Sequence, residues 1–309
     1  MDSTNFEVTP MVAWHNDAEL KQRAVAEMID SVVSDRIKQG SYFTTPINDF
    51  GAEPEDPTWS DGVTTDADWR GCFHGCLVAA RLLNSGLDIG EIWHVHDWHA
   101  RTAQMFGIPD FLGSILDMSF EHQQSLHGAG DFAVKTLEAI PVGADLGQFG
   151  HRVAKVLVLR EDVGVASWGC DQIGLPIWWG DLKRAVEADD TTAFGDLRAT
   201  VRAWTQEIVA DTRDRVTRTP ALVPNSVDPV NYRWYAEEME YLVGRVLACL
   251  ATTQEEGEWG GGEVIGSAFA LSERVWKACE IEGNDVDNGA NPAIYAALAA
   301  CEAPATQEA

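Results

Sequence analysis

Apolar residues recur at helical spacing in nearly every segment of this chain that shows a period, and this pattern limits the fold more than any other feature. In the C-terminal part it predicts one long helix or two over 191–216, and further helices over 231–251, 263–282 and 292–300. Prolines and glycines punctuate the connections between them. We therefore expect a helical bundle over residues 181–309.

The N-terminal half, residues 1–180, is predicted to be helical but rich in loops. A first helix is expected to begin at the N-cap Asn16, with Glu19 in capping-box position, and to stop at Gly40. The stretch 41–69 contains prolines and no sustained period, which is typical of a long loop. Further helices are predicted over 75–83, 100–106, 110–121, 131–140 and 153–159, although the last run has the pattern of a strand as well. The predicted fold class is mainly α, with a soft domain boundary near Gly180.

The chain is strongly acidic. It carries 49 Asp and Glu against 22 Lys and Arg, a formal net charge of −27. Such a field repels phosphate backbones and anionic headgroups, so it disfavours direct binding of nucleic acid. Three explanations stay open: solubility in a salty cytoplasm, a cation-binding surface, and an acidic decoy that imitates nucleic acid. Solubility is the favoured one, because overall charge acts on solubility before function.

Cysteine usage predicts a reducing compartment. The six cysteines are scattered and do not form the spacing of a disulfide framework. We find no leader-like N-terminus and no apolar run near 18 residues, so a cytoplasmic protein without a membrane segment is expected. The cysteines are Cys72, Cys76, Cys170, Cys249, Cys279 and Cys301.

Cysteine and histidine cluster between residues 71 and 99, and these are the ligand types that zinc prefers. The candidate metal ligands are Cys72, Cys76, His94 and His99. Their spacing is looser than the paired ligands of structural zinc sites. The favoured alternative is a partly buried segment whose imidazoles bond to backbone and carboxylates. A thiol nucleophile with a histidine base is a further hypothesis, against which stands the tendency of free cysteines to be buried as small hydrophobic residues.

Tryptophan is abundant, with 12 in 309 residues, and many lie in the loop-rich half. Indoles there are suited to stack a planar ligand such as a nucleobase. Ordinary core filling is the favoured alternative. The candidate ligand-binding residues are Trp69, Arg70, His74, Trp93, His96, Trp98, His99 and Arg101.

Three sequence blocks occur in an order that suggests a relationship. They span residues 71–77, 106–112 and 137–146. With these blocks the chain resembles a family of uncharacterised proteins encoded by tailed phages and actinobacteria, over roughly residues 37–159. The resemblance implies a phage-type accessory protein, for which interference with host defence is a common role, and it implies no particular activity.

Together these features lead to one functional hypothesis and two alternatives. The leading hypothesis is a non-catalytic binding protein, forming a homo-oligomer, whose N-terminal half captures a small nucleotide-like ligand or a host protein. The first alternative is a metal- or cysteine-dependent hydrolase that uses the Cys and His cluster, with zinc as the metal. The second is an acidic mimic of nucleic acid.

Overall fold

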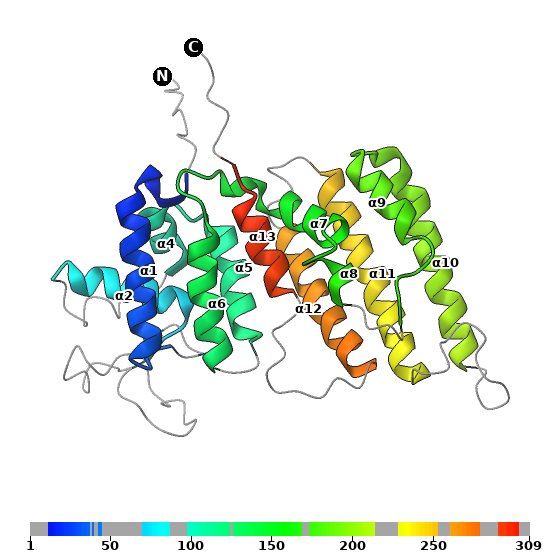
Figure 1. The fold of residues 1–309 in the computed structure, drawn as a ribbon, viewed down its shortest axis with the longest axis horizontal. Coiled ribbons are helices and arrows are strands. Elements are labelled where there is room, and N and C mark those ends of the chain that lie inside the picture. Colours follow the sequence, from blue (N-terminus) through cyan, green and yellow to red (C-terminus); the bar gives the residue numbers. More distant parts are fainter. Residues whose placement is uncertain are drawn as a thin grey trace, which may run out of the picture. The chain divides into compact units, whose positions relative to one another are not determined.

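A computed structural model shows a mainly helical protein, as the sequence predicts (Figure 1). Within the described part of the chain, strand pairing consists of two short strands of two residues each and one isolated bridge between Ile37 and Gly71. The structure describes residues 12–37, 39, 43–44, 70–86, 98–123, 126–168, 173–213, 228–252, 260–278 and 290–302. The predicted loop over 41–69 therefore lies almost entirely outside the described residues.

The described residues form two compact units. Unit 1 extends to Leu146 and also includes Cys301 and Glu302, and unit 2 extends from Gly147 to Ala300. The sequence placed a soft boundary near Gly180, whereas the contacts divide the chain after Leu146. Glu302 is joined to the rest of unit 1 by a hydrogen bond of 2.8 Å, which the Asp145 backbone N–H donates to its carbonyl oxygen.

Unit 1 is a small cluster of helices. Its helix α1 packs on α2 and α6, and α2 also packs on α4 and α5. Strand β2 leads into α2 and pairs antiparallel with β1, with Phe43 opposite Gly71. The elements are η1 (Ala13–Asn16), α1 (Ala18–Val33), β1 (Phe43–Thr44), β2 (Arg70–Gly71), α2 (Phe73–Asn84), α4 (Trp98–Phe106), α5 (Asp110–Glu121) and α6 (Leu126–Ala139).

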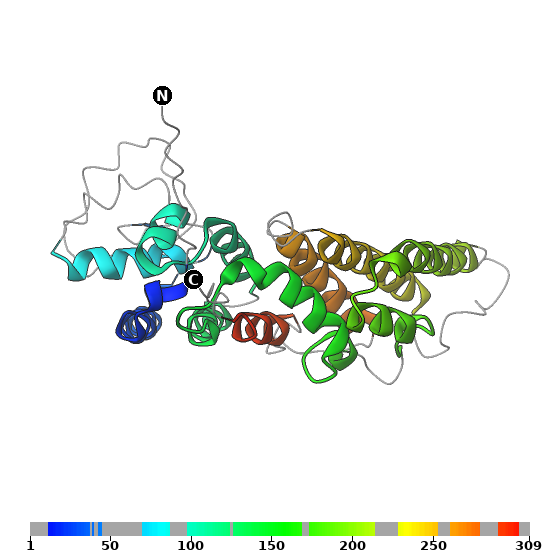
Figure 2. The same cartoon turned by 90° about the horizontal axis from the view of Figure 1, so that it is seen from above.

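Unit 2 contains the helices predicted for the C-terminal bundle and, in addition, the preceding helices from α7 onward. The long helices α10, α11 and α12 lie side by side, with α11 between the other two, and α7 packs on α9, α12 and α13 (Figures 1 and 2). Residues 153–159 belong to a helix, so the favoured interpretation of that ambiguous run is confirmed. The elements are η3 (Leu146–Gln148), α7 (Phe149–Leu159), α8 (Val165–Trp168), α9 (Trp179–Glu187), η4 (Thr191–Ala193), α10 (Phe194–Arg213), α11 (Pro229–Ala251), α12 (Gly260–Ala278) and α13 (Asn291–Ala299).

The first long helix differs in its ends from the prediction. Asp17, not Asn16, is the N-cap of α1, because its carboxylate accepts from the backbone N–H groups of Glu19 and Leu20. Asn16 instead has a left-handed backbone, with φ of 63°. The helix ends at Val33 rather than Gly40, and Asp35, with φ of 55°, turns the chain.

A left-handed turn before α1 is held by a buried indole. Trp14, with φ of 60°, is fully buried and donates from Nε1 to the carbonyl oxygen of Ile140 at 3.1 Å. Its ring meets Phe106 edge-on, with 6.1 Å between centroids. A non-glycine residue in this region is strained by about 1 kcal/mol or more, so burial and hydrogen bonding must offset that cost.

The tryptophans of the irregular stretch in unit 2 are core residues. Trp168, Trp178 and Trp179 are all buried, and Trp178 meets Trp204 edge-on with 5.5 Å between ring centroids. These indoles fill space between helices, which is the favoured alternative to a stacking pocket. None of the described helices is both long and apolar enough to cross a membrane.

Two glycines of unit 1 allow a test of how tightly the left-handed turn is packed. We expect Gly107→Ala to lower the free energy of unfolding by at least about 3 kcal/mol, because the new Cβ would lie 2.1 Å from the Val12 carbonyl oxygen and φ is +67°. Gly86→Ala is the matched control: φ is +80° but nothing lies within 4 Å, so we expect a loss of about 1 kcal/mol. Urea unfolding with peptide-level hydrogen exchange measures both, and equal losses would contradict this account.

Candidate functional site

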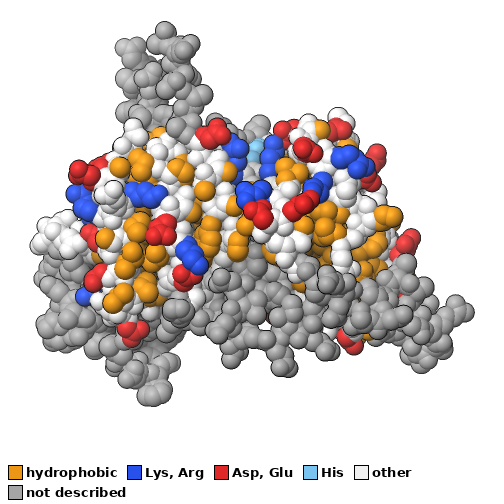
Figure 3. Space-filling view, viewed as in Figure 1, with side chains coloured by type: hydrophobic (Ala, Val, Ile, Leu, Met, Phe, Trp, Pro, Cys, Tyr) orange, Lys and Arg blue, Asp and Glu red, His pale blue; other side chains and the backbone are white. Residues whose placement is uncertain are grey.

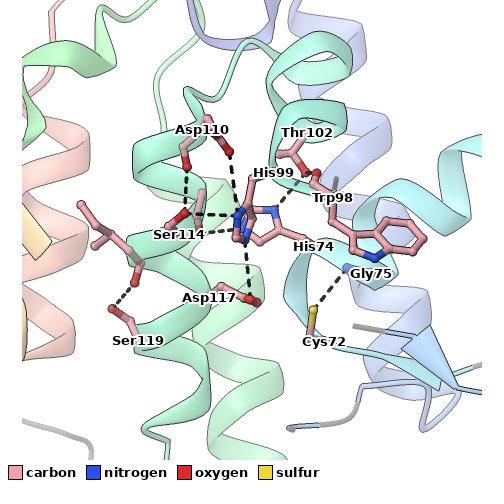
Figure 4. A network of polar contacts seen from close by, with 12 residues as sticks. Cys72, His74, Gly75, Trp98, His99, Thr102, Asp110, Ser114, Asp117 and Ser119 are labelled. Carbon is pink, nitrogen blue, oxygen red and sulfur yellow. Dashed lines mark hydrogen bonds and ion pairs between the residues drawn. The ribbon is translucent and has the colours of Figure 1, made fainter. Parts of the chain in front are cut away.

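A network of polar side chains joins three helices of unit 1. It forms where the first turn of α2, the first turn of α4 and one face of α5 meet, and Figure 4 shows the side chains converging there. Several of them are residues that the sequence singled out. The members are Cys72, His74, His99, Thr102, Asp110, Ser114 and Asp117.

His74 is the fully buried centre of the network. Its Nδ1 lies 2.9 Å from Thr102 Oγ1 on α4, and its Nε2 lies 2.8 Å from the carbonyl oxygen of Gly113 on α5. A carbonyl only accepts, so Nε2 carries a proton and donates it. One imidazole on α2 thereby fixes both α4 and α5.

Burial keeps this imidazole neutral. It lowers the pKa of His74 from 6.5 to about 4, although the nearby Asp117 carboxylate acts in the opposite direction. The Thr102 hydroxyl carries one proton, which it can donate either to Nδ1 of the neutral ring, 2.9 Å away, or to the Trp98 carbonyl oxygen, 2.8 Å away. Both ring nitrogens are therefore occupied by protein groups, and His74 holds the site together rather than reacting in it.

His99 lies between polar groups on one face of α5. Its Nδ1 is 3.2 Å from Ser114 Oγ and 3.8 Å from Asp110 Oδ1, and its Nε2 is 3.7 Å from Asp117 Oδ2 (Figure 4). Asp110, Ser114 and Asp117 recur at helical spacing, which places them along one stripe of α5. The side chain of His99 is 19% exposed, so the edge of the network reaches the surface of unit 1.

Gly113 makes room for both imidazoles. A Cβ at this position would lie 3.4 Å from His74 Cε1 and 3.4 Å from His99 Cδ2. The two rings meet edge-on above it, with 4.9 Å between centroids. A side chain larger than alanine would therefore displace one or both rings.

Asp117 is a buried carboxylate that stays ionised. Burial alone would raise its pKa, but His99, His74 and the Cys72 thiol more than offset that effect, and the pKa lies below its ordinary value. Asp117 Oδ1 has no hydrogen-bond partner among the described residues. A buried, charged oxygen without a hydrogen-bond donor is costly, so a further donor at Asp117 Oδ1 would stabilise the network.

The two thiols at the start of α2 are buried and protonated. Burial and the neighbouring Asp117 raise the pKa of Cys72 well above its ordinary value, and burial raises that of Cys76 to about 12. Cys76 Sγ lies 3.2 Å from the Gly71 carbonyl oxygen. Neither thiol is poised as a nucleophile, since the thiolate is the reactive form.

The structure brings together part of the predicted site. Cys72, His74 and His99 share the network, and buried Trp98 contributes its backbone carbonyl. Arg101 lies exposed on α4, with Nη1 3.5 Å from Gln104 Oε1. Trp69, Trp93, His94 and His96 lie outside the described residues, and only the backbone of Arg70 is described.

Helix α5 supplies partners that are not among the residues predicted from the sequence. Asp110, Ser114 and Asp117 carry a usable signal, because polar residues at that spacing share a stripe of a helix whose remaining positions are mostly apolar. Thr102 carries no comparable signal, since a lone threonine in a helix is common. Its role follows only from the packing of α4 against α2.

The described residues contain no group of three or more His, Cys, Asp and Glu side chains that could hold a metal ion. The predicted zinc ligands are not tested as a set, because His94 lies outside this part of the chain. A zinc site formed by Cys72, Cys76, His94 and His99 stays a prediction. It would require two buried, protonated thiols to lose their protons.

Comparisons of the chain with protein-family models, with curated proteins and with solved structures give no match. The resemblance to proteins of tailed phages and actinobacteria thus stays a prediction. A function has to be inferred from the side chains themselves.

The buried His74 predicts a particular dependence of stability on pH. The unfolded chain takes up a proton near pH 6.5 and the folded chain only near pH 4, so lowering the pH across this range favours unfolding. We expect the free energy of unfolding to fall by about 3 kcal/mol because of His74 over this pH range. In His74→Gln this pH-dependent loss of stability is absent. The difference in free energy of unfolding between the wild type and the variant therefore narrows or reverses as the pH falls.

Thr102→Val is the matched control. It removes the hydroxyl that His74 contacts but leaves the titrating ring, so its stability should retain the pH dependence of the wild type. Hydrogen exchange of peptides from α2, α4 and α5 between pH 7 and pH 4 measures these differences, after correction for intrinsic exchange rates. Parallel pH curves for the wild type and His74→Gln would contradict a neutral, buried His74.

The thiols give a second test. We expect Cys72 and Cys76 to resist alkylation by iodoacetamide at pH 8 in the folded protein and to react fully in urea, because burial excludes the reagent and keeps the thiols protonated. Peptide mass spectrometry reads each cysteine separately. Rapid modification of Cys72 in the folded protein would show an activated thiol and restore the hypothesis of a cysteine-dependent enzyme.

Proposed function

We propose that this chain is a non-catalytic binding protein that captures a small nucleotide-like ligand at the His99–Asp117 end of the polar network in unit 1. The observation that carries the proposal is the ionised, buried Asp117, whose Oδ1 has no hydrogen-bond partner in the described part of the chain. A ligand that donates an N–H to this oxygen would remove the cost of leaving it without a partner.

Nucleobases suit this chemistry. Their edges present amino and ring N–H donors, which carboxylate side chains accept in base recognition. Ser114 adds a hydroxyl that both donates and accepts, and His99 forms the partly exposed edge at which a ligand would enter. Asp110 and Asp117 make this end of the network acidic. The base of the ligand, rather than a phosphate, therefore contacts it.

Binding fits the network better than catalysis does. The thiols are protonated and buried, and the neutral His74 has both nitrogens engaged by Thr102 and Gly113. Ser114 lies close to His99, but its hydroxyl also lies 3.3 Å from the Asp110 carbonyl oxygen of the preceding helical turn. A hydrolase would need an activated nucleophile and donors for a developing oxyanion, and the interior of a helix offers no free N–H groups for that role.

The acidic-mimic alternative finds no support on the face drawn in Figure 3. There the described carboxylates are interspersed with Lys and Arg side chains instead of forming a continuous acidic surface. Among the described carboxylates, Asp131 forms an ion pair with Lys135, and Glu161 forms one with Lys183. A nucleic-acid mimic would need carboxylates free to occupy the positions of successive phosphates.

A biological role in sequestration is consistent with this proposal. A phage-type accessory protein that interferes with a nucleotide signal needs tight binding and no turnover. That role is drawn from the resemblance of residues 71–77, 106–112 and 137–146, and it is the reason to test nucleosides first. Capture of a host protein and homo-oligomer formation stay predictions.

The Asp117 proposal predicts the effect of one nearly isosteric change. We expect at least one of guanosine, adenosine, cytidine and uridine to bind the wild type, and Asp117→Asn to weaken that binding by roughly tenfold or more, because a hydrogen bond to a charged group contributes about 1.5–3 kcal/mol. Isothermal titration calorimetry measures the affinities. Asp131→Asn, at an exposed ion pair on α6, is the control and should bind as the wild type does.

Native mass spectrometry of freshly purified protein complements the titration. It reads the mass of any bound small molecule together with that of the oligomer. If no nucleoside binds the wild type and no small molecule accompanies the purified protein, the proposed function is wrong.

A further inference from the structure

A groove in unit 2 offers chemistry that the network in unit 1 lacks. It lies between α10 and α11 and has a volume of about 520 Å³. That volume is within the usual range of small-molecule sites, roughly 300–1,000 Å³. The groove is lined by side chains of both helices and by the backbone at Gly244.

Three arginines line this groove together with two glutamates, Glu237 and Glu240, although the chain as a whole is strongly acidic. Arg198 and Arg202 come from α10 and Arg245 comes from α11. Arg198 donates from Nη2 to the Gly244 carbonyl oxygen at 3.1 Å and has no carboxylate partner among the described residues. Its remaining N–H groups can meet a phosphate in the bidentate geometry that arginine favours.

The other two arginines are held in place by local partners. Arg202 Nε lies 3.3 Å from Glu240 Oε1, and the side chain is 72% exposed, so the outer guanidinium edge stays accessible. Arg245 donates to Glu263 at 2.6 Å and to the Tyr241 hydroxyl at 2.7 Å. These contacts orient the guanidinium groups before a ligand arrives, which lowers the entropy cost of binding.

An aromatic wall completes the groove. Tyr241 is 54% exposed, and the guanidinium carbon of Arg245 lies 4.8 Å from its ring centroid. A flat tyrosine face and a planar guanidinium are both surfaces on which a base can stack. The floor is open at Gly244, where an added Cβ would meet nothing within 4 Å.

We propose that this groove binds the phosphate chain of a small nucleoside polyphosphate, with Arg198 and Arg202 on the phosphates and the base against Tyr241. The proposal goes beyond the site in unit 1 and does not rest on it. A small ligand suits this protein, because the net charge of −27 repels a polyanion more strongly the longer it is. A ligand with three phosphates makes close contacts with the arginines and meets only limited long-range repulsion.

The first experiment removes charge. Isothermal titration calorimetry with ATP and with inorganic tripolyphosphate should show binding to the wild type and at least tenfold weaker binding to the double variant Arg198→Gln, Arg202→Gln. The control Arg184→Gln, at an exposed arginine on α9, should change the affinity less than twofold. Absence of ATP and tripolyphosphate binding to the wild type, or equal affinities for the double variant, would overturn the proposal.

The second experiment fills the groove and leaves its charges in place. Gly244→Leu should keep the protein folded, because leucine favours a helix by about 1 kcal/mol over glycine and the new Cβ has space. It should weaken ATP binding at least tenfold. Gly180→Leu, at an exposed helical glycine outside the groove, is the matched control and should bind ATP as the wild type does. An unchanged ATP affinity in Gly244→Leu would show that ATP binds elsewhere, and it would refute the proposal that the groove is the binding site.

The two sites are distinguished by their probes. Tripolyphosphate has no base and reports on the groove alone, whereas nucleosides have no phosphate and report on Asp117. If Asp117→Asn abolishes ATP binding while the groove variants bind normally, the groove proposal fails and the proposed function stands. The reverse pattern supports the groove and leaves the site in unit 1 without a ligand.

Discussion

The contact of His74 with two other helices is the interaction on which the organisation of unit 1 depends. A buried imidazole on α2 reaches α4 through Thr102 and α5 through Gly113, and its neutral state follows from burial. Because the ring satisfies both of its nitrogens with protein groups, it can be enclosed without leaving a polar atom unpaired. The same packing brings His99 and Asp117 together at its edge.

Enclosure of the network also explains the state of its charged and thiol groups. Asp117 stays ionised because His99, His74 and Cys72 surround it, and its negative charge helps to keep the Cys72 thiol protonated. A carboxylate next to a thiol thus has the opposite effect to a cationic neighbour, which would favour the thiolate. The arrangement stabilises a charged acceptor rather than a nucleophile, and this is the physical ground for preferring binding over hydrolysis.

Sequence patterns predict the helices of this protein better than its site. The period of apolar residues locates α7 and α10 to α13, because each buries one continuous stripe. The end of α1 was misplaced, since Asp35 adopts a left-handed backbone that no periodicity announces. Cys72, His74 and His99 stand out by residue type. Asp117 stands out only by its spacing from Asp110 and Ser114 along α5, and its position beside His99 depends on how the helices pack. Arg198 and Arg245 were missed because their proximity depends on how α10 and α11 pack.

Local charge, rather than net charge, decides which ligands the two units can accept. The formal charge of −27 disfavours long polyanions, yet the α10–α11 groove gathers three arginines and the unit 1 network presents two carboxylates. Interactions within a few ångströms are screened less than the field of the whole chain, because salt screens exposed charges beyond about 8–10 Å. An acidic protein can therefore offer an arginine-rich groove in one unit and an acidic acceptor in the other. The two sites therefore present different chemistry, with guanidinium groups in the groove and carboxylates in the network of unit 1.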